Sequence, residues 1–186
     1  MKQWVVALLA VAALAGVALV PLPFDDTIRI RDSVSIDRDP EVVFAYVTTP
    51  ANWPTWHPSS LGVSGAVDHP LDLGEQVTED FLVAGRRGRA VWTVVLREAP
   101  ERWVIAGEAN GRRAGVVTYA LASIGAGTRF DRELVYASPN LLFAALNRLS
   151  LRAKIARESA DAVRRLKQGL EAAAGREREA WSSGSA

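Results

Sequence analysis

An uncharged apolar run lies close to the N-terminus of the 186-residue chain. The sequence WVVALLAVAALAGVALV begins at Trp4, and the apolar stretch continues to Phe24 before Asp25 ends it. Roughly 20 residues in an α-helix span about 30 Å, the hydrocarbon thickness of a bilayer. The pattern therefore predicts one transmembrane helix within residues 1–24, acting as an anchor or signal-anchor. A cleaved secretory signal peptide is the alternative, but the run is long and has no small-x-small cleavage site near Asp25.

The charges that flank this segment bear on its orientation. Lys2 and the free amine favour a cytoplasmic N-terminus. On the other side, Arg29, Arg31 and Arg38 follow the segment closely, which opposes that orientation. We expect a single-pass membrane protein with its folded domain outside the cytoplasm. The membrane, contacted through residues 4–24, is thus one expected partner.

After the apolar run, the hydrophobic period is first that of a strand and then that of a helix. Residues Thr27–Ile36 (TIRIRDSVSI) alternate apolar and polar positions, which predicts a half-buried strand. The sequence Asp39-Pro40-Glu41 predicts a helix start, because Asp39 can cap, Pro40 suits the first turn and Glu41 complements the helix dipole. After that helix, ANWPTWHP at Ala51–Pro58 predicts a compact tryptophan-rich turn or short helix.

Short strands then follow at intervals of roughly ten residues, the spacing of an antiparallel meander. Turns containing glycine or proline separate them, among them GRRGR at Gly85–Arg89, APER at Ala99–Arg102 and GAG at Gly125–Gly127. We expect the arginines of GRRGR at a solvated hairpin tip. The six predicted strands are Leu61–Val67, Gln76–Val83, Ala90–Glu98, Arg102–Ala109, Gly115–Ser123 and Thr128–Ala137.

The hydrophobic period becomes helical after Pro139 and stays so until about Ala174. Two apolar stripes, one from Leu141 to Leu149 and one from Ile155 to Leu170, predict a long amphipathic helical region. The remaining residues, 175–186, are small and polar, and we expect them to form a flexible tail.

Composition narrows the classes of function. The chain is 49% apolar and 23% charged, which is typical of a globular protein. The lack of cysteine excludes disulfides and thiol nucleophiles, and two histidines are too few for a His-rich metal centre. No dinucleotide-binding, phosphate-loop, GxSxG or HExxH motif is present. We therefore expect no metal, no cofactor and, at a net charge of +1, no nucleic-acid partner.

Charge is divided unevenly along the chain. Residues Asp25–Ser138 hold 12 basic and 16 acidic side chains, whereas the residues from Pro139 onward hold 9 basic and 5 acidic ones. A basic helix on an anchored protein can rest against anionic lipid headgroups. The plainer interpretation is that these positions form the solvated face of a surface helix.

Four stretches give the chain a familiar order of elements. These are Ser33–Ser60, Glu98–Gly111, Thr118–Tyr136 and Ser159–Glu171, of which the first is the most specific. Together they resemble the START-like, or SRPBCC, superfamily, which includes polyketide cyclase/dehydrase-type and lipid-transport proteins. The resemblance implies an α+β helix-grip fold in residues 25–174, in which a curved antiparallel sheet wraps around the C-terminal helix. It also implies an apolar cavity between the two, with a hydrophobic small molecule or lipid as partner.

The tryptophan turn supplies three candidate ligand-binding residues. Trp53 and Trp56 either close the core near the start of the sheet or line the cavity. His57, placed between a tryptophan and a proline, is a candidate hydrogen-bonding group at the cavity mouth, where a neutral imidazole can also act as acid or base.

Strand alternation places Glu79 and Arg132 on the apolar faces of their strands. Burying a charge is costly unless it is paired, so the two are a candidate buried pair or an anchor for a ligand carboxylate or phosphate. A bulge that shifts the register would instead bring both into solvent.

Three further positions follow from the same alternation. Trp92 is expected to face inward as a core or cavity residue, whereas Arg97 on the same strand is expected to face water. Tyr119 and Glu108 are weaker candidates for a polar rim of the cavity.

Three functions remain open at this point. The first is a membrane-anchored START-like domain that binds or transfers a hydrophobic small molecule, and we expect this rather than an enzyme. The second is a polyketide cyclase/dehydrase-type enzyme in which His57, Glu79 or Arg132 moves protons or stabilises an enolate. The third is a non-catalytic module that touches membrane or a partner through Arg152, Arg157, Arg164 and Arg165. No residue is assigned as catalytic.

Overall fold

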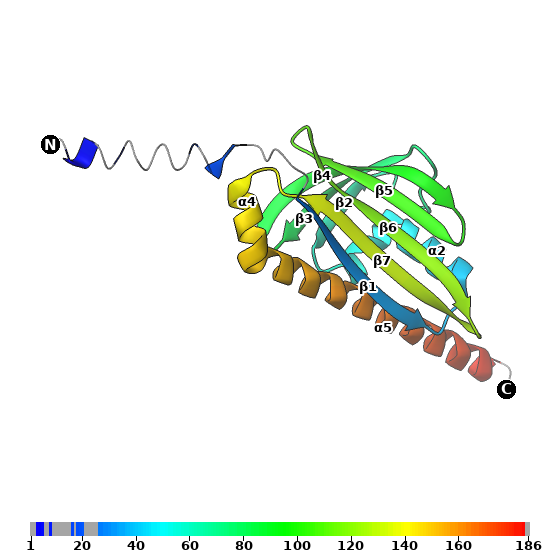
Figure 1. Cartoon of the computed structure of the whole chain (residues 1–186). Helices are drawn as coiled ribbons and strands as arrows, with labels where there is room; N and C mark the ends of the chain where they lie inside the picture. The colour runs from blue at the N-terminus through cyan, green and yellow to red at the C-terminus, as the bar shows by residue number, and fades with distance from the viewer. Residues whose placement is uncertain (1–2, 6–7, 9–15, 17, 21–25, 185–186) are drawn as a thin grey trace.

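Seven antiparallel strands form one sheet in the order β1-β7-β6-β5-β4-β3-β2. The computed structural model describes residues 3–5, 8, 16, 18–20 and 26–184, and Figure 1 shows its course. The strands are β1 (Thr27–Ile36), β2 (Ser60–Gly65), β3 (Gln76–Val83), β4 (Arg86–Glu98), β5 (Arg102–Ala109), β6 (Arg112–Ile124) and β7 (Gly127–Ala137). The α+β class and the curved antiparallel sheet expected from the resemblance are confirmed.

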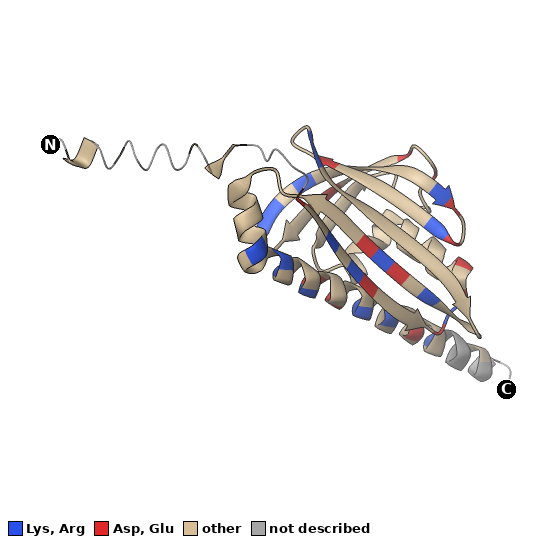
Figure 2. Cartoon of the chain, viewed as in Figure 1, with Lys and Arg blue, Asp and Glu red and all other residues tan. Residues whose placement is uncertain are grey.

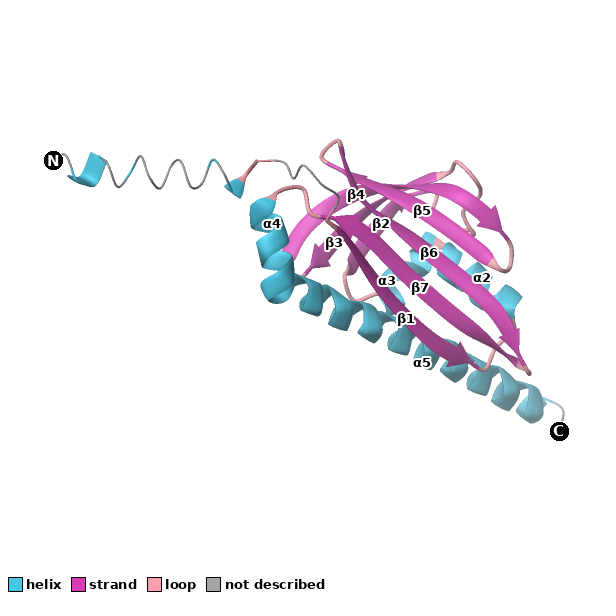
Figure 3. Ribbon diagram, viewed as in Figure 1, coloured by secondary structure: helices cyan, strands magenta, loops and turns pink. Residues whose placement is uncertain are grey.

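The helices lie on the concave side of this sheet, with α5 running along it (Figure 3). They are α2 (Pro40–Thr48), the 3-10 turn η1 (Pro50–Asn52), α3 (Trp53–Trp56), α4 (Leu141–Leu146), the π-helical turn η2 (Asn147–Leu151) and α5 (Arg152–Gly184). Two bonds at the far end of β1 hold α5 along that strand. Lys167 Nζ donates to the Ser35 carbonyl at 2.7 Å, and the Glu171 carboxylate accepts from the Asp37 N–H at 2.9 Å.

Two strands begin earlier than the hydrophobic pattern predicts. β4 starts at Arg86 and β6 at Arg112, because a two-residue turn carries the strand pairing to the tip of each hairpin. Ala84 and Gly85 have φ values of 49° and 83°, and Asn110 and Gly111 have 52° and 68°, which suits such hairpin turns. The arginines of GRRGR therefore lie on β4, which corrects their assignment to the tip.

The helix boundaries hold two further differences. Helix α2 begins at Pro40 as predicted, but the Asp39 side chain makes no capping hydrogen bond. Helix α5 continues through the expected tail as far as Gly184.

A bulge in β4 reverses the expected side of Arg97. The register shifts between Val94, which pairs with Ile105, and Leu96, which pairs with Val104. Because side chains alternate between the two faces of a strand, the extra residue moves each following side chain to the opposite face of the sheet. The Arg97 guanidinium consequently lies over the Phe44 ring on α2, 5.6 Å from its centroid, so the prediction that Arg97 faces water is wrong.

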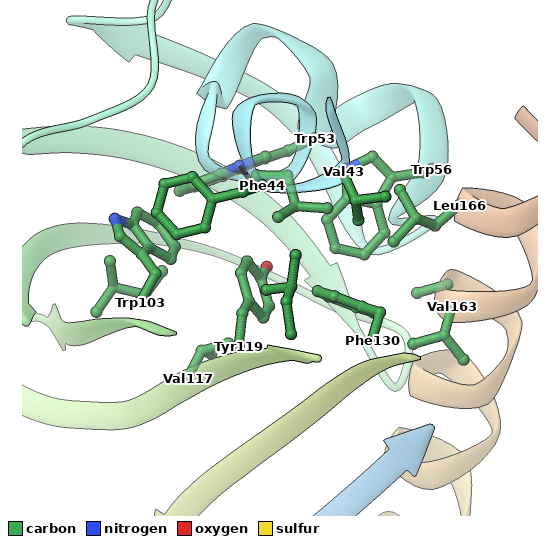
Figure 4. Packing of buried hydrophobic residues seen from close by; sticks show 14 of the residues in the cluster. Val43, Phe44, Trp53, Trp56, Trp103, Val117, Tyr119, Phe130, Val163 and Leu166 are labelled. Carbon is green, nitrogen blue, oxygen red and sulfur yellow. Dashed lines mark hydrogen bonds between the residues drawn. The ribbon is translucent and has the colours of Figure 1, made fainter. Parts of the chain in front are cut away.

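Aromatic side chains fill the interior beneath α2 and α3 (Figure 4). Trp103 stacks on Tyr119 with 5.4 Å between ring centroids and meets the edge of Trp53 at 6.4 Å. Tyr119 also contacts Phe130 at 5.2 Å and Trp56 at 6.2 Å. This packing fills the part of the interior that lies beneath α2 and α3.

Two hollows of the described chain lie on the outer surface of the sheet. One of about 340 Å³ is open to solvent over the outward positions of β1, β6 and β7, and one of about 360 Å³ is open over β2, β3 and β4. Neither lies between the sheet and α5. The apolar cavity that the resemblance implies therefore stays a prediction, and the part of the interior beneath α2 and α3 is filled by the aromatic cluster.

The expected transmembrane helix falls mostly on residues outside the described part of the chain. Among the residues that are described, no helix is both long and apolar enough to cross a bilayer.

Candidate functional site

A layer of polar side chains crosses the otherwise apolar interior. Asp32 on β1 is paired with Arg132 on β7, so both side chains point to the concave face. Glu79 on β3 points to the same face, and Ser159 on α5 contributes its hydroxyl to the layer. His57, which follows α3, completes it. The large aromatic cluster lies on one side of this layer, and a smaller cluster around Ile28, Ile30, Tyr136 and Ile155 lies on the other.

Arg132 is the centre of the layer and only 5% exposed. Its Nη1 donates to Ser159 Oγ at 2.8 Å, and its Nη2 donates to His57 Nε2 at 3.1 Å. The Ser159 hydroxyl in turn donates to the Asp32 carboxylate. Ser159 thus links the Asp32 carboxylate to the buried guanidinium of Arg132. These hydrogen bonds offset part of the free-energy cost of burying the positive charge.

The contact with Arg132 determines the protonation of His57. A guanidinium can only donate, so Nε2 of His57 must accept and the imidazole proton must lie on Nδ1. Burial, and after it the positive charge of Arg132, lowers the pKa of His57 well below its usual value. His57 is therefore neutral at pH 7.

Glu79 is held by a tryptophan instead of the arginine. Trp92 Nε1 donates to Glu79 Oε2 at 2.7 Å. Burial raises the pKa of Glu79. The nearby Ser60 hydroxyl, the hydrogen bond from Trp92 and the positive charge of Arg132 oppose this rise. The Trp92 ring lies over Gly107 on β5, where a Cβ atom would come within 2.6 Å of it. Among the described residues, Glu79 and Arg132 form no direct ion pair, so the candidate pairing is replaced by separate partners in one layer.

Four buried polar atoms of the described chain have no hydrogen-bond partner, and all lie at or next to this layer. They are Trp56 Nε1, His57 Nδ1, Ser60 Oγ and Arg132 Nε. Three of the four are donors, and the hydroxyl can donate as well. Unmatched buried donors are uncommon in folded proteins because each has lost its hydration. The arrangement matches a group rich in acceptor oxygens, such as a carboxylate or an enolate.

The wall of the interior differs on the two sides of the layer. Toward α4, the inward side chains Val83 on β3 and Leu134 on β7 are only half-buried. Toward α2, the aromatic cluster is almost fully excluded from water. Any opening to the polar layer therefore lies on the α4 side.

The structure brings four of the eight sequence-predicted residues together in this layer. His57, Glu79, Trp92 and Arg132 are brought together, and the remaining candidates are Trp53, Trp56, Tyr119 and Glu108. Trp53 is part of the core and donates to the Val47 carbonyl at 3.0 Å, whereas Trp56 borders the layer with an unpartnered indole N–H. Tyr119 is buried in the aromatic cluster with its hydroxyl next to Arg132, and burial raises its pKa to about 12. Glu108 is exposed, away from the layer.

Sequence reasoning missed three members of the layer. Asp32 falls on an inward position of the first alternating strand, so the same alternation that pointed to Arg132 could have found it. Ser159 lies on the buried face of α5, where a small polar residue carries little signal. Ser60 comes at the start of β2, and no pattern singles it out. No group of three or more potential metal-ligating side chains occurs among the described residues.

The stability of the fold should depend on pH through His57. Because its pKa is depressed in the folded state, the unfolded chain takes up a proton near the usual value of about 6.5 while the folded chain does not. The free energy of unfolding should therefore fall as the pH drops from 7 to 5, by at most about 1.4 kcal/mol per pH unit from this group. We expect His57→Gln to reduce that fall in urea denaturation at pH 7, 6 and 5.

His69→Gln provides a control of opposite sign. His69 is exposed, and hydrogen bonds to Asp68 and Glu75 raise its pKa, so it contributes stability at acidic pH that is lost as the pH rises. Removing it should make the loss of stability toward pH 5 steeper. An unchanged pH profile in His57→Gln would show that this imidazole titrates normally and is not buried beside Arg132.

Comparison with known proteins supports the fold. Residues 27–171 match the sequence model of the family described as polyketide cyclase / dehydrase and lipid transport. A solved protein from Rhodobacter sphaeroides is 24% identical, with 82% of this chain and 98% of that one covered at a TM-score of 0.58. A START superfamily protein from Mycobacterium smegmatis is 14% identical, with 77% and 97% covered at 0.56. TTHA0849 from Thermus thermophilus is 16% identical, with 78% and 99% covered at 0.63. No curated protein matches the chain.

Proposed function

Because the chain belongs to the polyketide cyclase / dehydrase and lipid transport family, we propose that it binds a hydrophobic small molecule with an acceptor-rich polar end. The polar end lies at the layer around Arg132, and the apolar part lies against the half-buried wall toward α4. The observation that carries this proposal is the set of unpartnered donors on Trp56, His57 and Arg132, gathered at the one charged layer of an apolar interior.

Binding requires an opening on the α4 side, and one contact sets where it can occur. The Glu158 carboxylate on α5 accepts from the Ala84 N–H at 3.0 and 3.2 Å and from Ser59 Oγ at 3.1 Å. It therefore fastens the β3–β4 turn and the start of β2 to the helix. Separating Ala84 from Glu158 would expose Val83, which packs in the smaller cluster, without disturbing the aromatic cluster.

A fluorescent fatty acid tests the proposal. The solved relatives consist almost entirely of this domain, so the fragment 26–184 is a suitable form for titration. We expect 11-(dansylamino)undecanoic acid to bind at least tenfold more tightly than its methyl ester, because the free acid offers a charged acceptor to Arg132. Ser60→Ala should reduce this preference, and Arg132→Met should abolish it. Arg129→Met, on the outward face of the same strand, should leave it unchanged.

Two results would count against this function. If neither probe binds the fragment, ligand binding in the interior is contradicted. If acid and ester bind equally and Arg132→Met has no effect on either, the polar layer is not where the ligand is recognised.

A cyclase/dehydrase-type enzyme is the second candidate, favoured by the convergence of titratable groups in the layer. The lone pair of His57 is taken by Arg132, so Glu79, whose pKa is raised, is better placed to exchange a proton with a substrate. We expect α-hydrogen exchange of 2-undecanone in D₂O, followed by NMR, to be faster with the protein than with buffer. Glu79→Gln should abolish the acceleration and Glu108→Gln should not; no acceleration at all would exclude this chemistry for simple ketones.

We also propose that residues 4–24 attach the domain to a membrane. The support is the uncharged apolar run, whose length suits a bilayer. Flotation of the full chain with phosphatidylcholine vesicles at high salt tests this, because an inserted segment stays bound when ionic contacts are screened. Recovery of the chain at the bottom of the gradient would contradict it.

A further inference from the structure

One end of the domain combines basic and exposed apolar side chains. We call it the basic end: the place where α4, η2, the start of α5 and the start of β4 meet. Its basic residues are Arg86, Arg87, Arg148, Arg152, Lys154 and Arg157. Figure 2 shows basic positions on these elements without an acidic one between them on α4 and η2. The residues 81–97 and 139–157 contain no aspartate or glutamate at all, so two acid-free segments meet here.

Side-chain contacts show that these segments are neighbours. Val83 and Ala84 from the β3–β4 turn pack in the same small cluster as Phe143 and Leu151 from α4 and η2. The bond from the Ala84 N–H to Glu158 ties the turn to α5 at the same place. Arg86 and Arg87, which follow that turn, are therefore held near the start of α5.

Three leucines of the basic end are exposed. Leu141 and Leu142 on α4 are 43% and 46% exposed, and Leu149 on η2 is 81% exposed. Apolar side chains beside arginines and lysines are the composition of a helix that lies in a membrane interface.

The arginines along α5 differ in how they are satisfied. Farther along the helix, Arg164 and Arg165 both pair with Asp161. In the described part of the chain, no carboxylate lies within ion-pair distance of Arg148, Arg152, Lys154 or Arg157. The charges of these four exposed side chains are thus not neutralised by an ion pair within the described domain.

The chain itself enters the domain at this end. The Ser138 N–H donates to the Asp26 carbonyl at 3.0 Å, directly before Asn140 caps α4. Asp26, which follows the apolar run by two residues, therefore lies beside α4, and β1 starts at the same end (Figure 1). If that segment is in a bilayer, the basic end is the part of the domain next to it.

We propose that the basic end docks on an anionic bilayer surface, with Leu141, Leu142 and Leu149 in the interface and the six basic side chains against lipid headgroups. The inference rests in part on the proposed attachment through residues 4–24. Each basic residue near an anionic surface contributes about a fivefold increase in binding. Docking this end also turns the α4 side, where the proposed opening to the polar layer lies, toward lipid.

A single-cysteine probe tests the docking on the full chain, because the natural sequence has no cysteine. Leu149→Cys carries an NBD fluorophore, and the protein is reconstituted in nanodiscs of phosphatidylcholine alone or with 30% phosphatidylglycerol. We expect NBD at 149 to emit at shorter wavelength and at least twofold more strongly in the anionic discs. Ile124→Cys, at the end of β6 and at the opposite end of the domain, is the matched control and should not respond to the lipid.

Charge variants identify the surface. Replacing Arg148, Arg152, Lys154 and Arg157 together by glutamine should abolish the response at 149. The double variant Arg164→Gln/Arg165→Gln should preserve it, because those two side chains are already paired.

The outcomes separate docking from attachment. If the chain stays with the discs but NBD at 149 behaves like NBD at 124, the docking is overturned and the anchor stands. If the chain leaves neutral discs but still binds anionic ones with the 149 response, the anchor fails and the docking stands. A response at 149 that survives the fourfold variant would overturn recognition of anionic lipid and point to a protein partner.

Discussion

Replacing Arg132 by methionine should lower the free energy of unfolding by about 2–4 kcal/mol. The substitution keeps most of the side-chain volume but removes two charge-assisted hydrogen bonds, to Ser159 and to His57. It also removes the positive charge that balances Asp32 in a part of the protein with little water. Asp32 would then be left as a partly buried charge whose only tie is a serine hydroxyl. Urea denaturation followed by circular dichroism measures the change.

Arg129→Met is the matched control for this prediction. Arg129 lies on the same strand but on its outward face, where it pairs with Asp131 and is 56% exposed. Exposed ion pairs contribute little, so the control should change stability by less than about 1 kcal/mol. Equal stability of the Arg132 variant and the control would show that the buried layer does not depend on the guanidinium. That result would contradict the interpretation of the layer as a pre-formed anion site.

Hydrophobic periodicity was sufficient for the strands whose apolar pattern runs to both ends. β1, β3 and β5 begin and end where alternation predicts, because each has a clear inward set of apolar residues. β4 and β6 extend further than predicted because Arg86 and Arg112 pair across the hairpin through backbone bonds alone. Those bonds need no apolar side chain, so they leave no trace in the hydrophobic pattern.

The candidate site was predicted in part, and the limits have physical reasons. Alternation placed Arg132 and Glu79 inward, and the register confirms both positions. Their partners depend on which strands are neighbours and on how α5 is rotated, and a single sequence carries neither. The face of Arg97 was predicted wrongly because the bulge after Val94 shifts the strand register by one residue. No residue pattern in the sequence marks this bulge.

The expected apolar cavity illustrates a second limit of prediction from a single sequence. Apolar positions indicate which side chains face inward, but not whether their volumes sum to the space available. Here Trp53, Trp56, Trp103 and Tyr119 point to the same region and fill it. The resemblance therefore identified the fold correctly, while the packing of the interior depends on the volumes of the individual side chains.

Trp103→Ala should be the most destabilising single change in the aromatic cluster, at about 3–5 kcal/mol. Trp103 is fully buried, stacks on Tyr119, meets the edge of Trp53 and donates from Nε1 to the Leu71 carbonyl at 3.4 Å. Truncation removes these contacts and leaves a cavity that rigid neighbouring rings cannot fill. Urea denaturation followed by circular dichroism avoids the change in tryptophan fluorescence that the substitution itself causes.

Leu73→Ala is the control, since Leu73 is 67% exposed and its truncation should cost less than about 0.5 kcal/mol. A second measurement connects the cluster to ligand binding. Trp103 lies on the sealed side of the polar layer, so a variant that stays folded, such as Trp103→Phe, should retain its preference for the dansyl acid over the ester. If that preference disappears while Arg132 and its partners are intact, the ligand occupies the aromatic cluster and not the α4 side. The unpartnered donors would then mark only the edge of the binding site, because the apolar part of the ligand would have to displace the rings themselves.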